Sequence, residues 1–264
     1  MKVALRAGPL ADLSTAIVGL GLTAVTVAAW AGVLAQARPG HSAMGGPVSA
    51  GFELGAVTNF AIAWLVMMAA MMLPSAAPLV LLYRVAGAGA RAINTVFLVA
   101  GYLIVWAAFG LPVLAVQQAL MVAASDGSMV ARSLPYAVAA VLGLAGLYQF
   151  TPLKEACLRQ CRSPLDFLIQ RWHGGGPLAA MRLGCEHGAY CVGCCWGLMA
   201  VLVVAGTMSL AWVTLITLLI FMEKVLPFGR RAAQLSGGLL LLLAVVVAIR
   251  PEVAGLLRGA GMGM

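Results

Sequence analysis

Charged residues are scarce in this chain of 264 residues, which has 16 Lys and Arg and 8 Asp and Glu, together 9% of the sequence. Soluble globular domains carry about 25% charged residues, so this chain lacks the side chains that a water-facing surface needs. Hydrophobic residues make up 63% of the sequence, and the mean hydropathy is strongly positive. These proportions exclude a soluble protein and predict an integral membrane protein that sits in a lipid bilayer.

Several kinds of functional motif are also missing. The sequence has no phosphate-binding loop, no zinc-protease helix, no paired carboxylates for acid–base catalysis and no serine-hydrolase motif, so nothing points to an enzyme. The expected spans contain no Asp, Glu, Lys or Arg, and Glu223 and Lys224 fall just beyond one of them. Because intramembrane charges mark proton relays and ion paths, this argues against a proton-driven transporter or a channel for charged solutes.

Apolar runs predict an all-α, polytopic transmembrane helix bundle with about seven spans, since a span needs about 20 mainly apolar residues. We expect a single integral membrane domain (1–264) with spans at residues 13–35, 55–83, 92–124, 133–151, 187–205, 209–222 and 232–249. Residues 152–188 are the expected cytoplasmic loop, with a short interfacial helix around 163–172. The first run resembles a signal peptide but exceeds the usual apolar core of about 7–15 residues, so we expect it to be retained.

Basic residues are distributed unequally between the two sides that seven spans define. With the N-terminus inside, twelve of the sixteen Lys and Arg residues fall on the inner side. The four on the outer side are Arg38, Arg132, Arg250 and Arg258. Because basic loops remain in the cytoplasm, the count favours a cytoplasmic N-terminus and explains the net charge of +8 without nucleic acid binding.

All six cysteines lie between positions 157 and 195, at or near the predicted cytoplasmic face, where thiols stay reduced and disulfides are not expected. Cys157 and Cys161 are spaced i, i+4, and Cys191, Cys194 and Cys195 are spaced i, i+3, i+4, so each group shares one face of a helix. Three or four thiolates suit a soft metal such as Cu(I) or zinc. These five cysteines are therefore candidate metal ligands.

Other residues near the cysteines modify this interpretation. The neighbouring cations Lys154, Arg159 and Arg162 would favour the thiolate form. His187 lies one turn before Cys191 and is a further candidate ligand, whereas Cys185 fits neither group. Buried cysteines also pack as small hydrophobic residues, which is the alternative that needs no metal.

Methionines form a second sulfur pattern. Four of them lie in the expected second span: Met67, Met68, Met71 and Met72. At about 100° per residue these four share one side of a helix, opposite Ala69 and Ala70. Met199 extends the stripe of Cys191 and Cys195 one turn into the bilayer. We predict an intramembrane thioether relay, with ordinary core packing as the alternative because methionine packs adaptably.

Four segments together resemble a known family. They are WLVMMAAMMLPSAAP (64–78), YQFTPLKEACLRQCRSP (148–164), HGAYCVGCCWGLM (187–199) and EKVLPFG (223–229). They are similar to the predicted metal-binding integral membrane protein family of bacteria, a family of unknown function, over about residues 55–250. The resemblance implies a multi-span, metal-binding protein of the inner membrane.

Three functions remain open at this point. The leading one is a binding or transport protein for a soft metal, with copper as Cu(I) first and zinc second, and with a metallochaperone or a membrane subunit as the expected partner. The second is a thiol redox protein that passes electrons through Cys191 and Cys194, although the sequence has no outward cysteine to receive them. The third is a structural or assembly subunit whose cysteines only pack.

Overall fold

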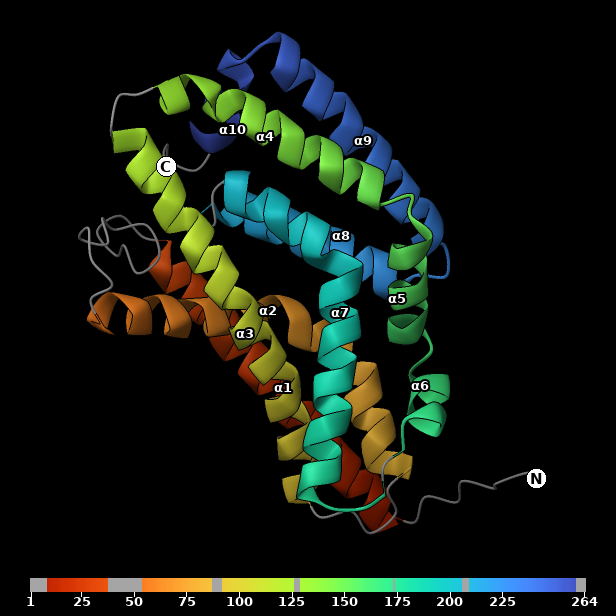
Figure 1. The fold of residues 1–264 in the computed structure, drawn as a ribbon. Helices are drawn as coiled ribbons and strands as arrows, with labels where there is room; N and C mark the ends of the chain where they lie inside the picture. Colours follow the sequence, from red (N-terminus) through yellow and green to blue (C-terminus); the bar gives the residue numbers. More distant parts are fainter. Residues whose placement is uncertain are drawn as a thin grey trace.

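The computed structural model describes residues 9–37, 54–86, 92–125, 129–172, 174–205 and 209–259. All regular elements in these ranges are α-helices, which confirms the expected all-α class (Figure 1). The helices are α1 (Pro9–Gln36), α2 (Leu54–Ala86), α3 (Ala92–Ser125), α4 (Met129–Tyr148), α5 (Pro152–Arg162), α6 (Pro164–Gln170), α7 (Pro177–Ala205), α8 (Leu210–Val225), α9 (Gly229–Ile249) and α10 (Glu252–Gly259).

Five helices in the described ranges are long and apolar enough to cross a membrane, namely α1, α2, α3, α7 and α9. The count rises to six if α4 and α5, which meet at a bend of 65°, form one broken span. The multi-pass bundle is thus confirmed, but with five or six candidate spans in place of about seven. The difference includes α8, whose 16 residues extend about 24 Å, less than the hydrocarbon core of about 30 Å.

The connection expected at 152–188 is helical for most of its length. α6 matches the short helix expected at 163–172, and α7 starts at Pro177, ten residues before the expected span. Three of the charges that marked this stretch as polar pair with one another: Glu186 lies 3.1 Å from Arg182 and 3.6 Å from Arg171. Upstream, the Thr151 hydroxyl accepts from the Lys154 amide at 3.3 Å and caps α5.

α7 lies at the centre of the bundle, in contact with α3, α4, α5 and α8. Its closest neighbour is α3, because glycines remove the side chains that would separate the two backbones. A Cβ at Gly184 would lie 2.0 Å from the Leu98 carbonyl oxygen, and one at Gly101 would lie 2.1 Å from the Met181 carbonyl oxygen. Small residues allow such close approach between membrane helices.

α5 is tied to the end of α8. The Arg162 guanidinium donates to the carbonyls of Leu226, at 2.9 Å, and Pro227, at 3.0 Å, where α8 ends. A Cβ at Gly229 would lie 2.0 Å from the Glu223 carbonyl oxygen, so only glycine permits the tight turn into α9. α9 then packs along α4 (Figure 1).

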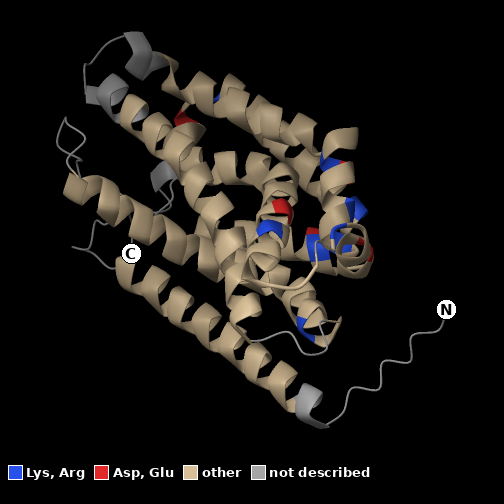
Figure 2. Ribbon diagram, turned by 60° about the horizontal axis from the view of Figure 1, so that its bottom comes forward, with Lys and Arg blue, Asp and Glu red and all other residues tan. Residues whose placement is uncertain are grey.

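Most charged residues of the described chain gather around α5, α6 and the neighbouring ends of α7, α8 and α9 (Figure 2). Large hydrophobic side chains are exposed along the other helices. Leu20, Leu235 and Ile249 are each more than 70% exposed and suit a lipid-facing surface. The side of the membrane on which the charged region lies remains a prediction.

Candidate metal centre

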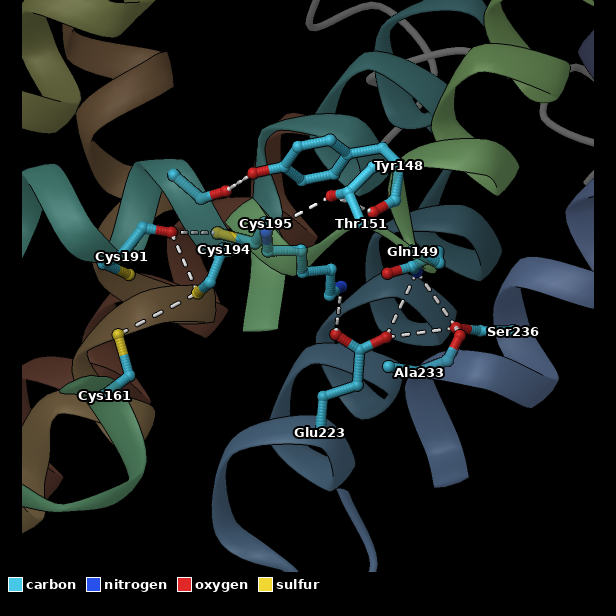
Figure 3. A network of polar contacts seen from close by, with 12 residues as sticks. Tyr148, Gln149, Thr151, Cys161, Cys191, Cys194, Cys195, Glu223, Ala233 and Ser236 are labelled. Carbon is cyan, nitrogen blue, oxygen red and sulfur yellow. Dashed lines mark hydrogen bonds and ion pairs between the residues drawn. The ribbon is translucent and has the colours of Figure 1, made fainter. Parts of the chain in front are cut away.

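The two cysteine groups meet inside the bundle. The Sγ of Cys161, on α5, lies 3.9 Å from the Sγ of Cys194, on α7 (Figure 3). Residues 33 positions apart in sequence are therefore brought together by the packing of α5 against α7.

The two sides of this contact differ in exposure. Cys191, Cys194 and Cys195 are each 1% exposed, whereas Cys157 and Cys161 are half-buried. All six cysteines of the chain are free thiols. The candidate site is thus deeply buried on its α7 side and more accessible on its α5 side.

Cys157 reaches α7 where that helix has no side chain. A Cβ at Gly193 would lie only 2.8 Å from the Cys157 Sγ, so glycine leaves the space that this thiol occupies. The Tyr148 hydroxyl donates to the Gly193 carbonyl and fixes the end of α4 to the same turn (Figure 3). Gly193, within the CVGCC segment, has no side chain that could bind a metal and was therefore not among the ligands predicted from the sequence.

The thiols on α7 are oriented by their own helix. Cys194 Sγ donates to the Cys191 carbonyl at 3.1 Å, and Cys195 Sγ donates to the same carbonyl at 2.8 Å. Among the described residues, no three His, Cys, Asp or Glu side chains converge as a preformed ligand cage. The sulfur pair of Cys161 and Cys194 is therefore the core of the candidate site.

Lys224 enters the site from α8. Its Nζ lies 2.8 Å from the Cys191 Sγ and 3.3 Å from the Ser75 Oγ, and the residue is only 6% exposed. Neither partner is a carboxylate. A cation beside a thiol favours the thiolate form, and Lys224 is the cation in contact with Cys191.

Tyr102 connects the cysteines to the methionine-rich part of α2. Its hydroxyl lies 3.0 Å from the Cys191 Sγ and 3.4 Å from the Met72 carbonyl oxygen, and its side chain is 2% exposed. The Lys224 contact to Ser75, one turn further along α2, makes a second link between the same two regions. The methionine-rich segment therefore adjoins the thiol site at Met72.

The predicted relay methionines are all buried in the core that also contains the α7 cysteines: Met67, Met68, Met71, Met72 and Met199. Ala69 and Ala70, on the side of α2 opposite the methionines, belong to the same buried core. Burial on α2 is therefore not limited to the methionine side of the helix. Burial is equally compatible with packing, and the relay remains a prediction.

His187 is buried among aromatic rings. Its ring centroid lies 5.1 Å from that of Phe167 and 5.8 Å from that of Tyr102. Its Nδ1 has no hydrogen-bond partner among the described residues. The Cys185 thiol donates to the Gly101 carbonyl at 3.4 Å, in the contact between α3 and α7.

Comparison with known proteins agrees with a metal-handling membrane protein. A family model described as PpoB2, copper chaperone, matches residues 61–247, which is more than two thirds of the chain and includes both cysteine groups. No curated protein and no solved structure gives a significant match. The extent of the family match settles the assignment: this multi-pass membrane protein belongs to the PpoB2 copper chaperone family.

Proposed function

We propose that this protein binds copper as Cu(I) between α5 and α7 and passes it on through ligand exchange. The observation that carries this proposal is the 3.9 Å distance between the sulfurs of Cys161 and Cys194. Metal–sulfur bonds of about 2.3 Å place two ligating sulfurs roughly 4 Å apart, so this pair needs little movement to hold a metal. Soft thiolate and thioether ligands select Cu(I).

The remaining cysteines have distinct roles in this proposal. Cys191, beside Lys224, supplies the next thiolate, while Cys157 and Cys195 flank the pair and provide ligands for entry and transfer. His187, with its free Nδ1 one turn from Cys191, is the additional nitrogen ligand. Zinc is the weaker choice, because the family that the chain matches is described as a copper chaperone.

Beyond the thiols, the methionines of α2 and Met199 form the onward path. Tyr102 contacts both Cys191 and the Met72 carbonyl, and Lys224 contacts both Cys191 and Ser75. This path therefore adjoins Cys191. Thioethers carry no charge and need no deprotonation, so copper can leave a thiolate for a thioether without proton release. On the proposed inner-membrane topology, a cytoplasmic metallochaperone would load the thiols, and a membrane subunit or outer protein would receive the copper.

The thiol redox function is the second candidate, and the same sulfur contact favours it. A disulfide needs sulfurs about 2.05 Å apart, which a small closure of α5 toward α7 would allow between Cys161 and Cys194. This pair then replaces Cys191 and Cys194 as the preferred redox pair. If mild oxidation of the copper-free protein removes two free thiols and bound copper prevents this loss, copper binding and thiol redox chemistry use the same site.

Copper content of purified variants tests the main proposal. Wild type, Cys161→Ser, Cys194→Ser and Cys185→Ser are loaded with Cu(I) under reducing conditions, and bound copper per chain is measured. Cys185→Ser is the matched control because it lies on α7 but contacts Gly101. We expect wild type and the control to bind equally and the other two to lose copper. Equal copper in all four proteins contradicts the proposal.

A further inference from the structure

Two consecutive residues of α8 have separate polar surroundings. Glu223 Oε2 accepts from Lys154 Nζ at 2.6 Å, and its Oε1 accepts from Gln149 Nε2 at 3.2 Å and Ser236 Oγ at 3.1 Å (Figure 3). Both carboxylate oxygens of Glu223 are therefore engaged. The adjacent Lys224 directs its ammonium to Cys191 and Ser75 instead.

A buried ammonium needs negative charge nearby, because an isolated charge in an apolar interior is strongly unfavourable. The Ser75 hydroxyl is neutral, and Glu223 is already paired with Lys154. The groups around Lys224 that can become anionic at ordinary pH are the thiols, with Cys191 in direct contact and Cys194 and Cys195 one turn further along α7. The Lys224 charge is thus matched to the thiolates of the candidate site.

We propose that Lys224 is the fixed counter-cation of the copper site and makes it select monovalent over divalent ions. This inference rests on the proposed function. Two thiolates with Cu(I) carry one net negative charge, which Lys224 cancels. The same thiolates with Zn(II) are neutral, so Lys224 would leave an uncompensated positive charge in the bundle.

The direction of this selectivity does not depend on how many thiolates bind. For any fixed set of ligands, the Cu(I) complex carries one more negative charge than the Zn(II) complex. A cation held within a few ångströms therefore stabilises the Cu(I) complex more, and the low dielectric of the interior strengthens the effect. A purely structural role for Lys224 would instead change the affinities for both ions together.

The ratio of Cu(I) to Zn(II) affinity tests this inference in the full-length, detergent-purified protein. Both affinities are measured by competition with chromophoric chelators in wild type, Lys224→Met and Lys224→Arg. Lys224→Gln removes the same charge with a polar side chain and provides the measurement if Lys224→Met does not fold. Arg230→Met is the matched control, since it removes one positive charge from a side chain that is 68% exposed.

We expect loss of the Lys224 charge to lower the Cu(I)-to-Zn(II) affinity ratio by roughly tenfold or more, while Lys224→Arg and Arg230→Met stay near the wild-type ratio. An unchanged ratio in Lys224→Met or Lys224→Gln overturns the inference. The Cys194→Ser variant separates the two claims. If it loses copper while the Lys224 variants keep the ratio, only the counter-cation role is wrong; if it keeps copper, the proposed site itself is wrong.

Discussion

The Lys154 ammonium lies 2.6 Å from the Glu223 carboxylate, and both side chains are only 2% exposed. This ion pair joins α5 to α8 in the interior, and Arg162 adds a second link at the end of α8. Because α5 also carries Cys157 and Cys161, the pair helps to hold these thiols against α7. The stability of the bundle and the geometry of the candidate site are therefore connected through Glu223.

Removal of the Glu223 carboxylate should destabilise the protein. Glu223→Ala leaves the Lys154 charge buried without its partner, which costs about 3–5 kcal/mol in comparable buried pairs. The free energy of unfolding in detergent, measured with a chemical denaturant, checks this. The double variant Lys154→Met/Glu223→Leu replaces the pair by apolar groups and should recover most of the loss. Wild-type stability in Glu223→Ala would show that the pair does not hold α5 and α8 together.

The close packing of α3 and α7 should tolerate no side chain at Gly184. A Cβ there would lie 2.0 Å from the Leu98 carbonyl, so Gly184→Ala must push the helices apart, at a cost of about 1–3 kcal/mol. Gly238→Ala is the matched control, because nothing lies within 4 Å of the added Cβ. The control should stabilise α9 by up to about 1 kcal/mol through helix propensity. Equal unfolding midpoints for both variants would contradict the close packing of α3 against α7.

The methionine path predicts a change in copper release rather than in copper binding. Met68→Leu/Met72→Leu keeps the side-chain volume nearly constant, so folding should change by less than about 1.5 kcal/mol. The thiol site should still fill with Cu(I), but transfer to an external chelator, followed by stopped-flow absorbance, should slow several-fold. Met222→Leu, at a partly exposed position on α8, is the control. Equal transfer rates in all proteins would leave the methionines with a packing role.

The predicted orientation can be tested with a membrane-impermeant thiol reagent. Gln170→Cys, at an exposed position on α6, should react in inverted membrane vesicles and not in intact cells. Leu256→Cys, where the native side chain is 70% exposed on α10, should react from the outer side if seven segments cross and the N-terminus is inside. Labelling of the native cysteines in the wild-type protein is measured as the background. Reaction of Leu256→Cys from the cytoplasmic side would support an even number of crossings, such as the six that include the broken α4–α5 span.

Helix class and burial of sulfur follow from local sequence properties, which explains why they could be predicted. Long apolar runs dictate membrane helices, and the spacing of Cys191, Cys194 and Cys195 places their side chains on one face whatever surrounds the helix. The structure accordingly has buried thiols on α7 and buried methionines on α2.

Contacts between distant segments could not be predicted in the same way. The meeting of Cys161 with Cys194 depends on the bend of 65° between α4 and α5 and on packing against Gly193. Lys224 has the sequence signature of a surface residue at a helix end, and only tertiary contacts with Cys191 and Ser75 show that it is buried. The span expected to start at residue 187 belongs to a helix that starts at Pro177. The prediction was wrong because a charged residue such as Glu186 indicates a loop, whereas its ion pairs allow it to be helical.

The central claim, that copper binds between α5 and α7 through cysteine sulfur, is tested most directly by X-ray absorption of the copper-loaded protein. We predict two or three sulfur scatterers at about 2.3 Å in wild type and in Cys185→Ser, and one fewer around the residual copper that Cys161→Ser and Cys194→Ser still bind. Copper surrounded by nitrogen and oxygen alone, or the same sulfur number in all four proteins, would contradict the account.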